Sequence, residues 1–427
     1  MIAFKTALFL SRYSFLKHGF SLLVILLLLG SCSKNNAGNN GPAPVPPGTP
    51  PASGIIELEP YNFVLGTHAI SGSYQFTNEN KLVEQAKKVR EMGSNILKIT
   101  LGKNSADIYG INDVSKSATT LALFTNNSAY KAVCDMDFKY IFFWVHTLTS
   151  VDWKKEIDAA KEKVLYDEMY AFVSYLLTTY NNSGKTFFIG NWEGDWLLIP
   201  SYDRTVTPAP ELLANMTKWF QIRQRAVDDA KKASASSNVS VYHYIEANLV
   251  LKGMNGEPCV AQSVLPNVEV DLVSYSSYEA IKNKTYAQKK ADLESMFSYL
   301  ESKLKPKASL PFSRRVFIGE YGYQANASKP ETLQKQYDET KEIMKITFEL
   351  NIPFALHWQM YNNEYENGVS KEMSLINEQG NKTRQYVLHQ NFYKTMNTYL
   401  KEEKQKNNSY PTESAYRAKA IQVLAAL

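Results

Sequence analysis

Cysteine is scarce in this sequence, with 3 residues in 427. Cys134 and Cys259 lie far apart in the chain, so they are consistent either with a disulfide in an oxidising compartment or with two buried free thiols. His243 and His357 have no partner spacing typical of a metal site. No glycine-rich turn of the dinucleotide or phosphate type follows the first expected strand. We therefore expect chemistry that needs no metal and no cofactor.

An excess of charge of one sign is also lacking. The sequence has 47 Lys and Arg against 42 Asp and Glu, a formal net charge of +5. Lys5, Arg12 and Lys17 precede Cys32 with no acidic residue among them, which leaves 44 basic against 42 acidic residues in the rest. A chain so close to neutrality, with no basic block, is not expected to bind nucleic acid as its main partner.

Long hydrophobic runs are confined to the N-terminus. The apolar run 20–29 is short for a membrane-spanning helix, which needs about 20 residues. It follows basic residues and ends in Leu29-Gly30-Ser31-Cys32, which resembles the lipobox of bacterial lipoproteins. The resemblance implies a signal peptide over residues 1–31 and a lipid on Cys32. An uncleaved anchor is the alternative.

Residues 32–54 are rich in Asn, Gly and Pro, a composition typical of a flexible tether. The expected location is therefore the bacterial cell envelope, periplasmic or at the cell surface. There the domain would be exported and held at a membrane by acyl chains.

Aromatic residues and short apolar runs are plentiful in the rest of the chain, which has 27 Tyr, 20 Phe and 6 Trp. Apolar runs of strand length alternate with segments of helical periodicity. The strands are expected at 62–66, 95–101, 139–147, from 185, 240–246, 270–275, 315–320 and 352–359. The long helices are expected at 79–92, 155–180, 210–233, 285–304, 331–350 and 382–399, with shorter helices at 130–134 and 413–427.

Eight strands that alternate with helices predict an α/β fold with a parallel sheet buried on both faces. Eight such units favour closure into a (β/α)8 TIM barrel over an open sheet. The barrel is expected to span residues 55–403. Residues 404–427 are expected to form a C-terminal helical extension packed on it.

Two of the expected strands end in glutamate. Lys185–Trp196 (KTFFIGNWEGDW) contains Glu193, and Arg314–Tyr323 (RRVFIGEYGY) contains Glu320. Carboxylates avoid protein interiors unless they are paired or used. In a closed barrel the C-terminal ends of strands four and seven face the same mouth. Two such carboxylates are what glycosidic bond cleavage requires, and a separation of about 5 Å would predict a retaining mechanism.

On these motifs the chain resembles the retaining (β/α)8 glycoside hydrolases that carry two catalytic glutamates on strands four and seven, with glycoside hydrolase family 5 the nearest. Gly319-Glu320-Tyr321-Gly322 matches the turn that carries the nucleophile in that family. The resemblance implies that Glu320 is the nucleophile and Glu193 the general acid/base.

The resemblance also implies a set of substrate-binding residues at the strand ends. They are Lys98 on strand two, His146 after strand three, Asn191 and Trp192 after strand four, Tyr278 after strand six and Trp358 on strand eight.

Two departures from the family pattern matter. In the family the Asn and the acid/base Glu are adjacent, whereas Trp192 separates Asn191 from Glu193 here, which leaves Asp195 as a rival acid. The family also carries an Arg on strand two beside the nucleophile. Lys98 occupies that position and could supply the charge without the bidentate fork of Arg.

Less specific interpretations stay open for every one of these residues. Glu320 could be a structural ion-pair partner, Glu193 a loop carboxylate and Lys98 a helix-facing charge. His146, Tyr278 and Trp358 could belong to the core.

The leading hypothesis is an exported, lipid-anchored, monomeric glycoside hydrolase that acts on a polysaccharide or oligosaccharide. The alternative is a non-catalytic cell-surface glycan-binding lipoprotein on a degenerate glycosidase barrel, which the Trp192 insertion favours. A barrel enzyme of another reaction class is a more distant option.

Overall fold

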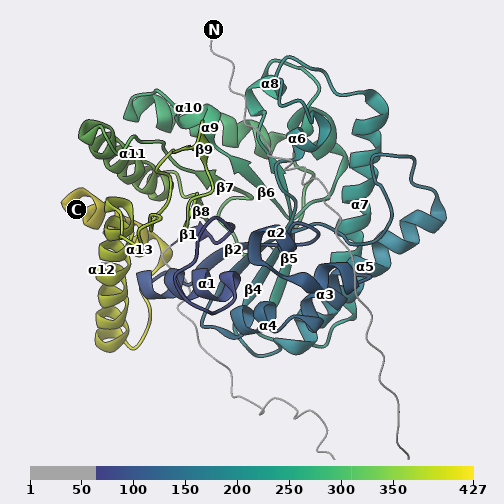
Figure 1. The fold of residues 1–427 in the computed structure, drawn as a ribbon, viewed down its shortest axis with the longest axis horizontal. Coiled ribbons are helices and arrows are strands. Elements are labelled where there is room, and N and C mark those ends of the chain that lie inside the picture. Colours follow the sequence, from purple (N-terminus) through teal and green to yellow (C-terminus); the bar gives the residue numbers. More distant parts are fainter. Residues whose placement is uncertain (1–63, 309) are drawn as a thin grey trace, which may run out of the picture. The chain divides into compact units, whose positions relative to one another are not determined.

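The computed structural model describes residues 64–308 and 310–427. Within them, eight parallel strands close into a barrel in the order β1-β2-β3-β4-β5-β6-β7-β8, and Figure 1 shows the helices arranged around it. The expected (β/α)8 TIM barrel is confirmed. The predicted signal peptide 1–31, the tether 32–54 and Cys32 lie outside the described residues.

The barrel strands lie close to the expected positions. They are β1 (Leu65–His68), β2 (Ile96–Leu101), β3 (Tyr140–Val145), β4 (Thr186–Gly190), β5 (Ser240–Ala247), β6 (Leu272–Ser276), β7 (Val316–Tyr321) and β8 (Ala355–His357). The first strand was expected at 62–66 and lies further along, so that His68 belongs to it. β9 (Tyr365–Glu366) and β10 (Val369–Ser370) form a separate two-stranded sheet.

The long helices follow the sequence periodicity. They are α1 (Lys81–Met92), α5 (Ala159–Thr179), α7 (Pro210–Ala233), α10 (Tyr286–Ser302), α11 (Pro330–Glu349) and α12 (Arg384–Asn407). Local chemistry fixes several of their ends. Asn80 caps α1, whose C-cap Gly93 has a left-handed φ of 112°, and Thr285 with Gln288 forms a capping box on α10.

Shorter helices occupy the loops. They are α2 (Ser105–Tyr109), η1 (Asn112–Lys116), α3 (Thr120–Asn126), α4 (Ser128–Asp135), α6 (Gly194–Leu198), α8 (Val250–Met254), η2 (Val260–Val264), η3 (Leu265–Asn267) and α9 (Tyr278–Ile281). The sequence predicted only the short helix at 130–134, which lies in α4.

The C-terminal part differs from the expected boundary in one respect. Helix α12 continues to Asn407, four residues past 403, because its last turns consist of Lys, Glu, Gln and Asn, of which the first three are good helix formers. Helix α13 (Glu413–Ala426) then packs against α11 and α12. Among the described residues, no helix is at once long and apolar enough to cross a bilayer.

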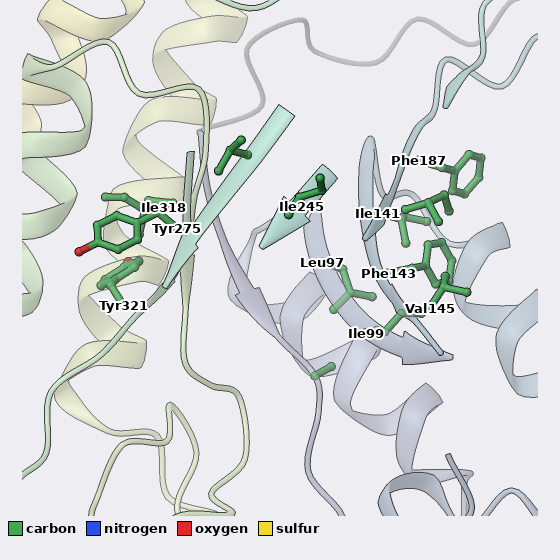
Figure 2. Close-up of a cluster of buried hydrophobic side chains, with 14 of the residues drawn as sticks. Leu97, Ile99, Ile141, Phe143, Val145, Phe187, Ile245, Tyr275, Ile318 and Tyr321 are labelled. Atoms are coloured by element: carbon green, nitrogen blue, oxygen red, sulfur yellow. The ribbon is translucent and has the colours of Figure 1, made fainter. Parts of the chain in front are cut away.

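Alternation along the strands separates two cores. On β3, Ile141, Phe143 and Val145 belong to the large cluster between barrel and helices, where Figure 2 shows them, whereas Phe142 and Trp144 belong to the cluster inside the barrel. Phe142 stacks on Phe188 of β4 with ring centroids 4.1 Å apart. Cys134 and Cys259 are both buried and unpaired thiols.

The inside of the barrel changes from apolar to polar toward the C-terminal ends of the strands. Phe142, Phe188 and Phe317 fill its lower part with aromatic rings. The inward positions that follow along the strands are Lys98 on β2, Trp144 on β3, Glu246 on β5 and Ser274 on β6, and they are buried. The barrel therefore has a packed floor and a polar layer directly under the strand ends.

Candidate active site

The nucleophile candidate, Glu320, lies on β7 and is only 5% exposed. Its Oε2 accepts a hydrogen bond from the Tyr278 hydroxyl at 3.3 Å. Ser277 fixes its backbone, because both the Ser277 N–H and its hydroxyl donate to the Glu320 carbonyl, at 3.0 and 2.9 Å. The other carboxylate oxygen, Oε1, is buried and has no hydrogen-bond partner within residues 64–308 and 310–427. One oxygen of Glu320 is thus anchored by a hydrogen bond, and the other accepts none from the described residues.

The acid/base candidate, Glu193, lies between β4 and α6, where it is the N-cap residue of the short helix. It is partly exposed. Its backbone N–H donates to Oε1 of Glu246 at 3.0 Å, and its carbonyl accepts from the Trp196 N–H at 3.0 Å. The segment that carries the carboxyl group is therefore held on both sides by hydrogen bonds, although Trp192 extends the turn by one residue.

The charge of Glu193 acts on Glu320. Burial raises the pKa of Glu320 well above its usual range, and the next causes are the negative charges of Glu193 and Glu246. Burial, followed by the charge of Glu246, raises the pKa of Glu193 to about 8. Burial also raises the pKa of Tyr278, followed by the charges of both Glu320 and Glu193. Both carboxyl groups therefore keep their protons to a higher pH than a solvent-exposed glutamate does.

Lys98 lies between Glu246 and the strand that carries Glu320. Its side chain is completely buried and its Nζ forms an ion pair with Oε2 of Glu246 at 2.6 Å. A longer hydrogen bond of 3.3 Å joins Nζ to the carbonyl of Gly319, the residue before Glu320. The ammonium also lies 4.3 Å from the ring centroid of Trp144. The ion-pair partner of Lys98 is therefore Glu246, while its charge also acts on Glu320 and lowers the pKa of that carboxyl group. The predicted contact of Lys98 with substrate stays a prediction.

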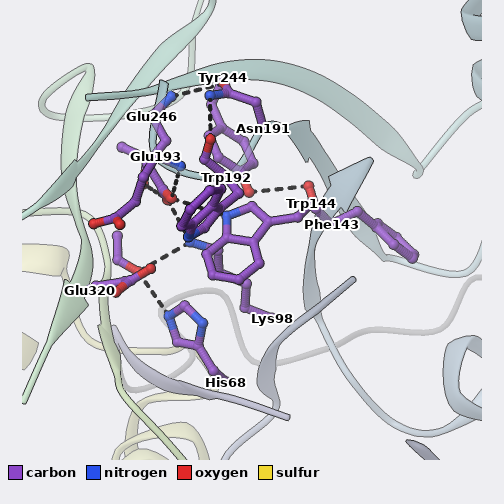
Figure 3. Close-up of polar contacts among 12 residues, drawn as sticks. His68, Lys98, Phe143, Trp144, Asn191, Trp192, Glu193, Tyr244, Glu246 and Glu320 are labelled. Atoms are coloured by element: carbon purple, nitrogen blue, oxygen red, sulfur yellow. Dashed lines mark hydrogen bonds and ion pairs between the residues drawn. The ribbon is translucent and has the colours of Figure 1, made fainter. Parts of the chain in front are cut away.

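The sequence did not lead us to assign Glu246, His68 or Trp144 to the site, although all three belong to this cluster (Figure 3). His68 Nε2 lies 2.9 Å from the Gly319 carbonyl, and Trp144 donates its indole N–H to Glu246 at 3.1 Å. The only sequence signals were weak ones. His68 lies beyond the expected end of the first strand, and Trp144 and Glu246 lie in apolar runs typical of a core.

Two residues near Glu193 have mainly structural contacts. Asn191 is completely buried, and its side-chain oxygen accepts from the Glu246 N–H at 3.1 Å, so its predicted contact with substrate stays a prediction. Asp195 is 1% exposed, and its carboxylate accepts backbone hydrogen bonds from Asn248, Leu249 and Val260 at 2.8–3.0 Å. Asp195 therefore anchors the loops after β4 and β5, which removes it as a rival acid.

The remaining residues predicted to bind substrate are Trp358, Trp192 and His146. Trp358, 8% exposed, donates its indole N–H to Glu364 at 3.3 Å and packs edge-on against His68. Trp192 is half-buried and packs on the inner core cluster. His146 follows β3, where burial and then the charge of Arg223 lower its pKa to about 4. In the described part of the chain, no hydrogen bond joins the His146 ring to the other site residues.

Comparison with known proteins bears on this architecture. No protein-family model matches the sequence, and no curated protein matches it. Solved structures do match. A GH5_18 protein from Bifidobacterium longum subsp. longum, in complex with Manb1-4GlcNAc, superposes with a TM-score of 0.52 at 10% identity over 78% of each chain. A GH5_18 protein from Streptomyces cattleya, in complex with the same ligand, gives 0.50 at 9% identity over 79% of this chain and 80% of its own.

The shared feature is the barrel fold. These neighbours belong to glycoside hydrolase family 5, so the resemblance expected from the strand-end motifs is found at the level of the fold. At such low identity the similarity assigns no residue a role. The catalytic and binding assignments stay predictions that depend on the geometry of this chain.

The raised pKa of Glu193 predicts a specific pH dependence of stability. Since the pKa rises from 4.5 to about 8 on folding, the group stabilises the fold fully below pH 4.5, and this contribution is lost as the pH rises through 8. Glu193→Gln lacks the charged form. We expect the variant and the wild type to have similar melting temperatures at pH 5 and the variant to be more stable at pH 9. A melting-temperature difference that is constant from pH 5 to 9 would contradict the raised pKa.

Proposed function

We propose that the chain is a retaining glycoside hydrolase in which Glu320 is the nucleophile and Glu193 the general acid/base. The observation that carries the proposal is the pair of carboxyl groups that follow β4 and end β7 of a closed (β/α)8 barrel, with the charge of Glu193 acting on Glu320. Glycosidic bond cleavage needs one protonated and one ionised carboxyl group at the same moment. The raised pKa of Glu193 suits it to be the protonated one near neutral pH.

The first half of the reaction follows from the contacts. The unpartnered Oε1 of Glu320 attacks the anomeric carbon, while the Tyr278 hydroxyl holds Oε2. Glu193 gives its proton to the glycosidic oxygen, and the C–O bond to the leaving sugar breaks. The products of this step are a glycosyl ester on Glu320, a free leaving group and an ionised Glu193.

The second half restores the enzyme. Glu193, now ionised, takes a proton from water, whose oxygen attacks the anomeric carbon and breaks the ester to Glu320. The sugar leaves with its original anomeric configuration, because two displacements each invert it. No cofactor takes part. Trp358 and Trp192 offer aromatic surface to the sugar, a role that supports a polysaccharide or oligosaccharide as substrate.

The test is incubation of the purified domain with a panel of β-linked glycans, with two readouts. New reducing ends and a first-formed product of retained configuration in ¹H NMR are the expected results. A product of inverted configuration would contradict the double displacement. Binding to a glycan with no product after prolonged incubation would support the non-catalytic glycan-binding protein instead.

The proposed location is the bacterial cell envelope, with the domain exported and held by a lipid on Cys32. The support is the sequence Leu29-Gly30-Ser31-Cys32 after a short apolar run. Cys32→Ser should shift the full-length protein from the membrane fraction to the soluble envelope fraction of an expressing bacterium. Unchanged membrane association of the variant would contradict lipid anchoring.

A further inference from the structure

A buried carboxylate that the proposed mechanism does not use lies under both catalytic candidates. Glu246 on β5 has no exposed surface. Its Oε1 accepts hydrogen bonds from the Trp144 indole N–H at 3.1 Å and from the Glu193 backbone N–H at 3.0 Å. Its Oε2 accepts from Lys98 Nζ and from the Ser274 hydroxyl, both at 2.6 Å. Four donors on two oxygens match the acceptor capacity of a carboxylate, and such pairing offsets the cost of its burial.

Two hydrogen bonds join Glu246 to the turn that carries Glu193, one to Asn191 and one to Glu193 itself. The Asn191 side chain accepts from the Glu246 backbone N–H, and the Glu246 side chain accepts from the Glu193 backbone N–H. These contacts fix the residues on both sides of Trp192. The turn is longer by one residue than in the resembled family, and the Glu246 carboxylate holds its far end against β5.

The same cluster reaches the strand that carries Glu320. Lys98 Nζ and His68 Nε2 both contact the carbonyl of Gly319, the residue before Glu320, at 3.3 and 2.9 Å. A side chain at position 319 would have its Cβ 1.7 Å from the Ser274 hydroxyl oxygen and 3.0 Å from Oε2 of Glu246. The backbone of β7 thus packs directly on the ion pair, which Figure 3 shows between the two glutamates and the indole of Trp144.

A buried ion pair is a poor way to stabilise a core. Desolvation of the two charges offsets most of their attraction, and apolar residues of similar volume often serve as well. Its contacts with the two backbones indicate a different use. We propose, building on the function proposed above, that Glu246 with Lys98 is a positioning device for hydrolysis. It holds the Glu193 backbone directly and the Gly319–Glu320 backbone through Lys98, so that both carboxyl groups address one glycosidic bond.

The variant Glu246→Gln tests this proposal. It keeps the volume and one oxygen acceptor but loses the negative charge beside Glu193. We expect kcat to fall about 100-fold with KM nearly unchanged, because the reacting groups lose their alignment while the sugar contacts remain. The charged groups that act on Glu193 include Glu246, Lys98 and Asp195, and the charge of Glu193 acts in turn on Glu320 and Lys282. With Glu246 neutral, the pKa of Glu193 falls and the alkaline limb of kcat/KM moves to lower pH.

Two further variants separate positioning from stability. Lys289→Met removes another buried ammonium, paired with Glu342 at 2.8 Å outside the barrel, and should lower the melting temperature without moving the pH profile. Ser274→Ala removes one donor to Glu246 without changing any charge. It should lower kcat less than Glu246→Gln does, and it serves if Glu246→Gln does not fold.

The outcomes distinguish this proposal from the proposed function. Titration of the glutamate carboxyl carbons by ¹³C NMR needs no turnover, and the signal that disappears in Glu193→Gln identifies Glu193. A lower pKa of that signal in Glu246→Gln supports the proposal even if the substrate screen finds no product. Where product does form, a shift of the alkaline limb to lower pH supports it as well. An unchanged Glu193 titration together with an unchanged kcat in folded Glu246→Gln or Ser274→Ala would overturn it, whatever the wild-type activity.

Discussion

Glu320→Gln is expected to lower kcat/KM on a cleaved β-glycan by about 10⁴-fold or more, since the amide cannot form the glycosyl ester. The substitution preserves volume, and the Tyr278 hydroxyl can still donate to the remaining side-chain oxygen. It also removes a buried carboxyl group whose pKa is raised, so the fold should not lose stability above pH 7. The measurement is kcat/KM beside a thermal melting curve for the same preparation.

The matched control is Glu402→Gln, the same chemical change on an exposed position of α12. It should leave kcat/KM and the melting temperature unchanged. If Glu320→Gln folds and keeps more than a tenth of wild-type activity, Glu320 has no part in the mechanism and the hydrolase proposal loses its nucleophile.

Glu193→Ala is expected to discriminate between leaving groups. With an unactivated sugar leaving group the variant should lose about 10²- to 10⁴-fold in kcat, because nothing protonates the departing oxygen. With a dinitrophenyl glycoside the first displacement needs no proton, so glycosylation should stay fast and the ester on Glu320 should accumulate as a burst. The alkaline limb that Glu193, with its pKa of about 8, gives to the wild-type profile should disappear.

Asp195→Asn is the control for this experiment, because Asp195 is the neighbouring carboxylate in the same turn. Its oxygens accept backbone hydrogen bonds, so its loss should lower the melting temperature and leave the leaving-group dependence intact. Equal losses on both substrates in Glu193→Ala would show that Glu193 is not the acid. A leaving-group effect in Asp195→Asn would return Asp195 as the candidate.

The barrel could be predicted from sequence because each of its elements carries a local signal. Apolar runs such as Phe187–Ile189 identify strands without knowledge of their neighbours, and Pro210–Ala233 begins with proline and keeps its helical period throughout. The first strand was placed too early because its signal is weak. Because the strand was expected at 62–66, His68 was not assigned to it. Helix α12 was expected to end at residue 399, where its apolar periodicity stops. Polar residues continue it to Asn407.

The two glutamates could also be predicted, since a carboxylate at the end of an apolar strand is costly unless it has a use. Their supporting contacts could not. Lys98 and Glu246 are separated by 148 residues and meet only because the barrel closes. Lys98 has two acidic neighbours, Glu246 and Glu320, and sequence gave no measure of which one it contacts. From the sequence, Asp195 rivals Glu193 as the acid. Only the structure shows that backbone N–H groups bind the Asp195 carboxylate.

The most direct test of the central claim is to trap the covalent intermediate. A 2-deoxy-2-fluoro glycoside of the sugar that the wild type releases, with a good leaving group, slows the second displacement more than the first. Digestion and mass spectrometry then locate the sugar. We predict one added glycosyl group on the peptide that contains Glu320, and none in Glu320→Gln. A label on any other residue, or full turnover with no label at all, would contradict it.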